Sequence, residues 1–410
     1  MRLALVTQLD PSEFLGGTEL VVRAQLRALV ERGHEVWLVA GTQRPSTGAA
    51  TVEGSQDGIR VVRVPRLPHE VYDLEILRPR IAHLVADAVR GADVVHVHHW
   101  FTLTSNLVRV LAAQVPVVVS LHDAFATCPR FFRCAPEPAI ACPPPGAFTA
   151  CARCVAPDAP GNAPAELERR LAARAAAFTA EVAAAAAVVA PSRAHAALVA
   201  PYLGLVSPRI QVIPHGLCRA LVRPERAPAR PGAPPVVLHF GNLGRGKGTL
   251  DLVRSLARLA PGSIELHLLG PALDPELHHA IERERGALAI TRGGAYGERE
   301  LEAAAARATL AAFPSRLAES YGLVVDESLA LGLPTWVSDR GALGERLGGA
   351  GRILPAEDVA AWTDAFEALL SRPSMLDAAR LALPNSPRRA ADAAAELEAL
   401  YQRVAREPRR

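Results

Sequence analysis

Lysine is almost missing from this chain of 410 residues: 44 of its 45 basic residues are arginine, and Lys247 is the one lysine. Aromatic side chains make up 5% of the sequence, and the formal net charge is only +3. So small a charge, with few rings for base stacking, gives no case for a nucleic-acid partner. The alanine-rich residues 172–190 are interrupted by Arg174 and Glu181, which excludes a membrane span there.

A secretory leader is also missing from the residues given. The apolar run at residues 3–7 is only of strand length, and polar Gln8 and Asp10 follow it, whereas a leader needs a longer core and a small-residue cleavage site. Half of the residues are hydrophobic and 21% are charged, as in folded soluble proteins. We therefore expect a cytoplasmic protein, and leave open whether its arginine-rich segments contact the inner face of the membrane.

Short apolar runs alternate with helical patterns in two series along the chain. Several runs are apolar throughout, which is typical of parallel strands covered on both faces. The first series predicts strands at residues 3–7, 35–40, 59–64, 93–98, 116–121, 187–190 and 210–213, with a helix at about 18–32. The second predicts strands at residues 236–240, 265–269, 288–291, 309–313, 335–337 and 352–354.

This alternation predicts an α/β fold of two tandem Rossmann-like, doubly wound domains, with ligands at the carboxyl ends of strands that face an interdomain cleft. We expect an N-terminal, acceptor-side domain over residues 1–217, with a cysteine-rich insert at 124–160. A proline-rich linker at 218–235 would precede a C-terminal domain over residues 236–385. Residues 386–410 would carry a last helix that packs back on the N-terminal domain.

The one lysine lies in a glycine-rich loop, residues 241–248, between a predicted strand and a predicted helix. Helix N-termini bind anions, and a compact ammonium can reach a phosphate from a narrow loop. The loop also has the Gly-x4-Gly-Lys spacing of a nucleotide triphosphatase. Gly248, however, stands where Ser or Thr would hold magnesium, and Thr249 comes one residue late. A P-loop-like triphosphatase is therefore the second hypothesis, and a chance lysine on a solvated loop is the simplest alternative.

Two glutamates, Glu319 and Glu327, flank Gly322 just after a predicted strand. Glycine lets the backbone approach a ligand closely, and Leu323 and Val324 are expected to offer amides at a helix start, with Glu327 in the first turn. Amides suit a diphosphate, and carboxylates can grip vicinal hydroxyls. Alone, the glutamate pair would leave an ordinary helix with an acidic first turn as the better interpretation. Together with the lysine loop in the same domain, it favours a sugar-nucleotide site.

In order and spacing, these motifs resemble the retaining glycosyltransferases of the family 4 type, which have the GT-B fold. The resemblance extends over nearly the whole chain. It rests on residues 14–19 (Phe-Leu-Gly-Gly-Thr-Glu), 32–36, 119–123, 188–192 and 212–216, together with the Lys247 loop and the Glu319/Glu327 pair.

The resemblance implies transfer of a sugar, with retention, from a nucleoside diphosphate sugar such as a UDP- or GDP-sugar. Polysaccharide, lipid-linked glycan and natural-product acceptors all stay open. The implied catalytic residues are His122 at the sugar, Lys247 at the diphosphate and Glu319 at the sugar hydroxyls. Further donor contacts are implied for Gly16, Gly17, Gly322, Leu323, Val324 and Glu327. The family needs no metal for its chemistry, because lysine and helix dipoles supply the positive charge.

Two departures from the family pattern affect donor binding. Asn242 stands where the family usually has an arginine, and we expect nearby Arg245 to replace it, so both join the donor-binding set. Residues 215–218 read His-Gly-Leu-Cys and lack the aspartate that often occurs there. A protein that binds a sugar nucleotide without turnover is therefore a third hypothesis.

Five of the six cysteines fall within 27 residues. Cys151 and Cys154 have the spacing of a metal knuckle, and with Cys134 and Cys142 they form the predicted ligand set of a structural zinc. Disulfides, disfavoured in a reducing compartment, and a redox pair are the alternatives. Cys128 is assigned to the loop itself.

Three histidines, His96, His98 and His99, lie at the end of a predicted strand. Their spacing alone specifies no metal, and we expect them to line the cleft near the acceptor.

Overall fold

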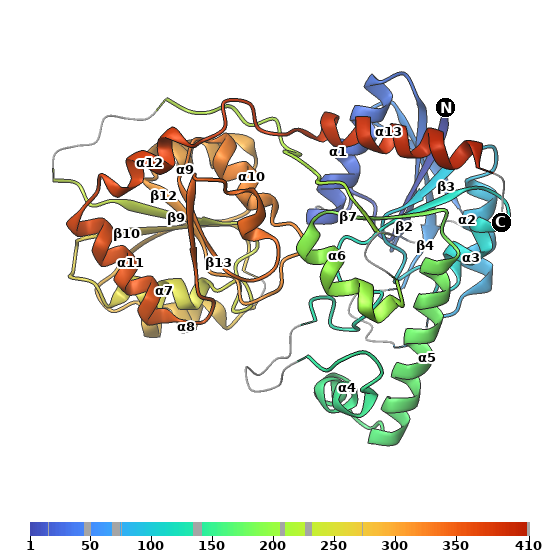
Figure 1. The fold of residues 1–410 in the computed structure, drawn as a ribbon, viewed down its shortest axis with the longest axis horizontal. Coiled ribbons are helices and arrows are strands. Elements are labelled where there is room, and N and C mark those ends of the chain that lie inside the picture. The colour runs from blue at the N-terminus through green and yellow to red at the C-terminus, as the bar shows by residue number, and fades with distance from the viewer. Residues whose placement is uncertain are drawn as a thin grey trace. The chain divides into compact units, whose positions relative to one another are not determined.

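The chain forms two α/β units, each with its own sheet (Figure 1). The computed structural model describes residues 1–14, 16–44, 51–67, 74, 76–133, 142–205, 210–225, 232–272 and 274–407. The first unit comprises Met1–Cys218 and Arg389–Arg410, and the second comprises Arg219–Arg388. Within the described ranges, no helix combines the length and the apolar character needed to cross a membrane.

The sheet of the first unit has eight strands in the order β3-β4-β2-β1-β5-β6-β7-β8. All pairings are parallel except that of β3 with β4. The central strands consist almost wholly of buried residues, because helices cover both faces. The strands are β1 (Arg2–Thr7), β2 (Glu35–Thr42), β3 (Val52–Gln56), β4 (Ile59–Pro65), β5 (Val94–Val97), β6 (Val117–Ser120), β7 (Ala187–Ala190) and β8 (Ile210–Val212).

Helices α1 (Gly17–Glu31) and α13 (Ala390–Arg406) lie side by side on one face of this sheet (Figure 1). Leu29, Leu397 and Tyr401 are buried in the core between these helices and the strands. The other face is covered by α2 (Pro79–Ala88), α3 (Leu107–Ala112), α5 (Pro164–Ala183) and α6 (Arg193–Val199). Helix α4 (Phe148–Val155) packs on α5, and short 3-10 turns follow α4 and α6 at Ala156–Asp158 and Ala200–Leu203.

The second unit has six parallel strands in the order β11-β10-β9-β12-β13-β14. Trp336, Trp362 and Phe366 are the largest side chains of its core. The strands are β9 (Val236–Phe240), β10 (Glu265–Leu269), β11 (Ala289–Gly293), β12 (Leu310–Phe313), β13 (Thr335–Ser338) and β14 (Gly351–Leu354). The helices are α7 (Thr249–Ala257), α8 (Leu277–Glu284), α9 (Glu298–Arg307), α10 (Leu323–Ala330), α11 (Val359–Ser371) and α12 (Met375–Leu381), with a 3-10 turn at Leu343–Arg346.

The predicted fold class, two doubly wound α/β domains, is confirmed. Every predicted strand has a counterpart whose ends differ by no more than two residues. Strand β3 was not predicted, because its sequence, Val-Glu-Gly-Ser-Gln, is mostly exposed and carries no apolar pattern. Helix α4 was not predicted either, since it lies in a stretch that the prolines suggested was irregular.

Candidate functional site

The predicted site residues of the second unit meet at one edge of its sheet. Strand β9 pairs with β10 on one side and with β12 on the other, so the loops that follow β9 and β12 adjoin at the carboxyl edge. Open α/β sheets bind ligands at this reversal of strand order. The loop after β9 carries Lys247, and the loop after β12 carries Glu319.

Lys247 and Glu319 form a direct ion pair. The Lys247 ammonium donates to Glu319 Oε1 at 2.7 Å, and Ser315 Oγ donates to the same oxygen at 2.9 Å. The lysine side chain is 27% exposed and the glutamate side chain 13%, so the pair is partly accessible to a ligand. Gly248 makes the approach of the two loops possible: its φ is +74°, and a Cβ there would lie 1.8 Å from the Pro314 carbonyl oxygen.

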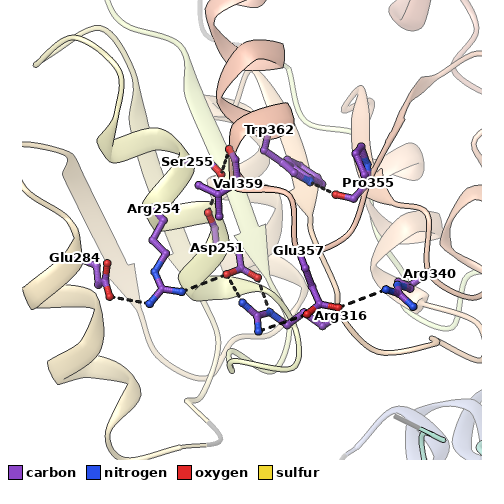
Figure 2. Close-up of polar contacts among 10 residues, drawn as sticks. All are labelled: Asp251, Arg254, Ser255, Glu284, Arg316, Arg340, Pro355, Glu357, Val359 and Trp362. Carbon is purple, nitrogen blue, oxygen red and sulfur yellow. Dashed lines mark hydrogen bonds and ion pairs between the residues drawn. The ribbon is translucent and has the colours of Figure 1, made fainter. Parts of the chain in front are cut away.

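Figure 2 shows the polar network that holds these two loops together. Asp251, in the first turn of α7, is 3% exposed. Its carboxylate accepts hydrogen bonds from Nε and Nη2 of Arg316 at 2.6 and 2.5 Å. The Arg316 backbone N–H also donates to the Gly246 carbonyl at 2.9 Å. A bidentate pair is directional, so it fixes the Glu319 loop against the Lys247 loop. The network extends outward through Arg254, Glu284, Glu357 and Arg340.

Helix α10 begins at Leu323, directly after Gly322. Gly322 has a φ of +78°, and a Cβ there would collide with a neighbouring leucine side chain. Leu323 and Val324 are the first two helical residues, and N–H groups at this position have no partner within the helix. Glu327 lies in the second turn and not, as predicted, in the first, where Asp326 is the acidic residue.

Glu327 is 4% exposed, and Arg219 Nε donates to its Oε1 at 3.0 Å. Burial raises the pKa of Glu327 to about 7, although the Arg219 guanidinium acts in the opposite direction. This carboxyl therefore titrates near neutral pH.

Asn242 and Arg245 lie on the same loop as Lys247. Asn242 is exposed. Arg245 Nε lies 3.3 Å from Asp274 Oδ2, and the arginine side chain is about half exposed at 52%. Arg245 is therefore paired with an acidic side chain beyond β10.

Thr249 does not serve as the magnesium ligand that a triphosphatase would need. Its hydroxyl is buried and accepts the Gly244 N–H at 3.1 Å. His239 Nδ1 lies 2.7 Å from the Ala312 carbonyl, so Nδ1 carries the proton, and Nε2 accepts from the Thr249 hydroxyl at 3.0 Å. Because this hydroxyl is held inside the fold, the geometry does not favour the P-loop hypothesis.

The first unit gathers histidines at the carboxyl ends of β5 and β6. His122 Nε2 lies 2.9 Å from His98 Nδ1, and the His122 ring stacks on His215 with centroids 5.0 Å apart. Burial lowers the pKa of His122 to about 3. His122 is therefore neutral near pH 7 and can act as both a hydrogen-bond donor and an acceptor.

His96 belongs to the interior and not to a ligand-binding surface, contrary to the expectation. It is 1% exposed, with Nδ1 2.6 Å from the Tyr401 hydroxyl and Nε2 2.8 Å from Ser120 Oγ. His99 Nε2 lies 3.5 Å from Asp123 Oδ2. The three neighbouring histidines thus have different surroundings.

Gly16 caps helix α1, and Gly17 is its first residue. Glu19, in the first turn, is 3% exposed and folds back so closely that a Cβ on Gly16 would lie 2.7 Å from Glu19 Oε2. Burial raises the pKa of Glu19, and backbone hydrogen bonds at residues 19 and 16 oppose the rise. Sequence reasoning named the glycines but missed this buried acid. Its position two residues after Gly-Gly, at a helix start, was a usable signal for an acid near the loop but not for its burial.

Four cysteines, Cys128, Cys142, Cys151 and Cys154, line one cavity of about 50 Å³ beside α4 and α5. Burial raises the pKa of the Cys142, Cys151 and Cys154 thiols, that of Cys151 to about 11. Cys134 of the predicted zinc set lies outside the described residues. Among those that are described, no three His, Cys, Asp or Glu side chains are arranged to hold a metal ion, so the zinc site stays a prediction.

Two doubly wound domains, with a lysine loop and an acidic pair at the strand reversal of the second, define a two-domain glycosyltransferase. The family comparison agrees: the model described as Glycosyltransferase Family 4 matches residues 15–219, and that of Glycosyl transferases group 1 matches residues 234–372. The chain belongs to Glycosyltransferase Family 4.

Relatives are similar over most of their length. A D-inositol 3-phosphate glycosyltransferase of Catenulispora acidiphila is 26% identical over 89% of this chain and 85% of its own. Sucrose-phosphate synthase from Thermosynechococcus elongatus has a similar fold, with a TM-score of 0.71 at 20% identity over 98% and 99% of the two chains. Anabaena HepE, solved in complex with UDP-glucose, has a TM-score of 0.61 at 18% identity over 99% and 98%.

Proposed function

We propose that this glycosyltransferase moves a sugar from a nucleoside diphosphate sugar to a hydroxyl-bearing acceptor, with retention at the anomeric carbon. Donor binding is supported by the Lys247–Glu319 hydrogen bond of 2.7 Å at the strand reversal of the second unit. A cation and a carboxylate held together offer complementary partners for a diphosphate and for sugar hydroxyls. HepE, which shares the fold, was solved with UDP-glucose.

In the proposed reaction, the Lys247 ammonium neutralises the charge that develops on the departing diphosphate, and the amides of Leu323 and Val324 assist at the start of α10. Glu319 orients the transferred sugar, and Glu327 accepts hydrogen bonds from the ribose diol. No metal ion is needed at the diphosphate in this scheme. His122, with its neutral imidazole, contacts a hydroxyl of the transferred sugar.

For the acceptor we propose a glycan or another polyhydroxylated molecule, bound by the first unit. Buried Glu19 and partly exposed Asp123, which directly follows neutral His122, offer hydrogen-bond acceptors suited to hydroxyl groups.

A donor screen followed by product analysis tests the proposal. UDP-, GDP-, ADP- and dTDP-glucose and GDP-mannose are compared for the rise in melting temperature that each causes, since a ligand that binds the native state stabilises it. Transfer is then followed in excess EDTA, and proton NMR gives the anomeric configuration of the product. The proposal would be overturned if ATP or GTP stabilised the protein and was hydrolysed in the presence of magnesium, while none of the sugar nucleotides stabilised it.

A further inference from the structure

Arg219 is engaged with the buried acid of the donor site. Its Nε donates to Glu327 Oε1 at 3.0 Å, and its Nη1 lies 3.8 Å from Glu298 Oε1. The guanidinium carbon lies 5.3 Å from the centroid of the Tyr296 ring. With its side chain only 13% exposed, Arg219 is held on three sides inside the second unit.

The other charged groups around Glu327 act against its ionisation. Asp326, the preceding residue, and Glu298 on α9 both raise the pKa of Glu327, and burial raises it most. Asp326 is itself occupied, because Arg346 Nε donates to it at 2.8 Å and the Tyr321 hydroxyl donates at 2.5 Å. Arg219 is the group that lowers the pKa of Glu327, and it does so from direct contact.

We propose that Arg219 is a positioning residue of the donor site, which favours the ionised form of Glu327 and aims its carboxylate to accept hydrogen bonds from the ribose diol. The inference rests on the proposed function, because it gives Glu327 the ribose hydroxyls as its ligand.

The chemistry of the carboxyl group explains why its charge matters. An ionised carboxylate only accepts hydrogen bonds, and with two oxygens it can receive Arg219 and a diol together. Once protonated, it carries a donor hydrogen and loses part of its acceptor capacity. A neighbouring cation removed from a buried site lets the pKa of the carboxyl rise, so loss of Arg219 would leave Glu327 protonated at pH values where the native site is ionised.

The test measures donor affinity against pH, from about pH 5.5 to 9, in the wild type and two variants, Arg219→Gln and Arg219→Lys. The candidate probes are UDP-glucose, GDP-mannose and ADP-glucose. The one that raises the melting temperature of the wild type is used, and calorimetry measures its affinity. We expect the midpoint of the wild-type profile near pH 7 and that of Arg219→Gln about one pH unit higher, which is about fivefold weaker binding at pH 7 and approaches about tenfold at lower pH. Arg219→Lys retains a cation without the planar fork, and its midpoint should lie between the two.

Arg223→Gln is the matched control, because Arg223 lies in the same segment but contacts the Leu329 carbonyl at 3.5 Å and not an acid. Its midpoint should match the wild type. Glu327→Gln should remove the pH dependence altogether. If Arg219→Gln does not fold, the comparison of Arg219→Lys with the wild type still tests the inference. Wild-type midpoints in the Arg219 variants would overturn the inference.

The two proposals fail in different ways. If none of the three sugar nucleotides binds the wild type, the proposed function fails. If one binds with a midpoint that Glu327 determines and Arg219 does not move, only the role of Arg219 fails. A loss of affinity in Arg219→Gln that is equal at every pH would show that the arginine acts on packing alone, and would also overturn the inference.

Discussion

The two units differ in the charge of the side chains at equivalent places, the carboxyl edges of their sheets. The second unit places acid–base pairs there: the Lys247–Glu319 pair and the Arg219–Glu327 pair. The first unit instead places His98 and His215 in contact with His122. Burial lowers the pKa of His98 and His122 far enough to keep both rings uncharged near pH 7.

This difference suits the two binding tasks proposed for the units. A diphosphate carries charge that a fixed cation can neutralise, whereas a sugar hydroxyl is neutral and can be bound by hydrogen bonds alone. The second unit is therefore expected to respond to the removal of charge and to pH, and the first unit to the removal of hydrogen-bonding atoms. Each experiment below tests this contrast.

Replacement of Lys247 by alanine should have the largest effect. We expect transfer to fall by about a thousandfold, the range seen when one preorganised electrostatic group is removed from an active site. Initial rates at saturating acceptor measure it. Arg258→Ala, an exposed change at the end of α7, should leave the rate within about twofold. Normal turnover in Lys247→Ala would contradict the role of the second unit.

The next effect is on stability. Asp251→Ala leaves Arg316 without its buried partner, and loss of one member of a buried ion pair costs about 3 kcal/mol. Urea unfolding, followed by a signal from the tryptophans of the second unit, measures the change in the free energy of unfolding. Asp377→Ala breaks the exposed pair with Arg380 and should cost less than about 1 kcal/mol. Equal losses would mean that the two loops do not depend on the network.

In the first unit, His122→Ala should lower transfer by about tenfold to a hundredfold, as expected for loss of a hydrogen bond made in a buried site. His122→Asn keeps a donor and an acceptor near the same place and should recover part of the rate. Because the native ring is neutral, the residual activity should show no new pH dependence between pH 6 and 8. A His122→Ala profile that differs in shape would indicate that the ring carries charge in the reaction.

The smallest effect is that of pH on the wild type. Glu327, with a pKa of about 7, is ionised above that pH and protonated below it, so donor affinity is lost as the pH falls. We expect the apparent donor affinity to drop about fivefold from pH 7 to pH 6. His96 and His122 do not contribute, since burial lowers the pKa of both to about 3. Glu327→Gln should have a flat profile, and a profile unchanged by this substitution would assign the titration to another group.

The sequence was enough for most of the fold, because buried parallel strands are apolar throughout and stand out between polar helices. It also located Lys247, Glu319 and Gly322, since a lone lysine and glycines at strand ends are local features. Strand β3 was not predicted because it is an exposed edge strand. Its stability comes from pairing with β4, so its sequence needs no apolar alternation.

Contacts between distant residues could not be predicted in the same way. The Arg219–Glu327 pair joins residues 108 positions apart, and Arg219 stands in what was expected to be a linker. Cys128, which was assigned to its loop, shares a cavity with Cys142, Cys151 and Cys154, because the packing of α4 on α5 brings them together. Glu19 was missed because burial of a carboxylate depends on the fold around it and not on its neighbours in sequence.

Helix α13 gives the order of synthesis a structural meaning. It supplies Leu397 and Tyr401 to the core of the first unit, and the Tyr401 hydroxyl bonds to His96 on β5. The ribosome makes the whole second unit before it makes this helix, so the first unit must wait with one face of its sheet incompletely covered. During translation the second unit can therefore finish folding first, which reverses the usual order in which the earlier domain matures before the later one.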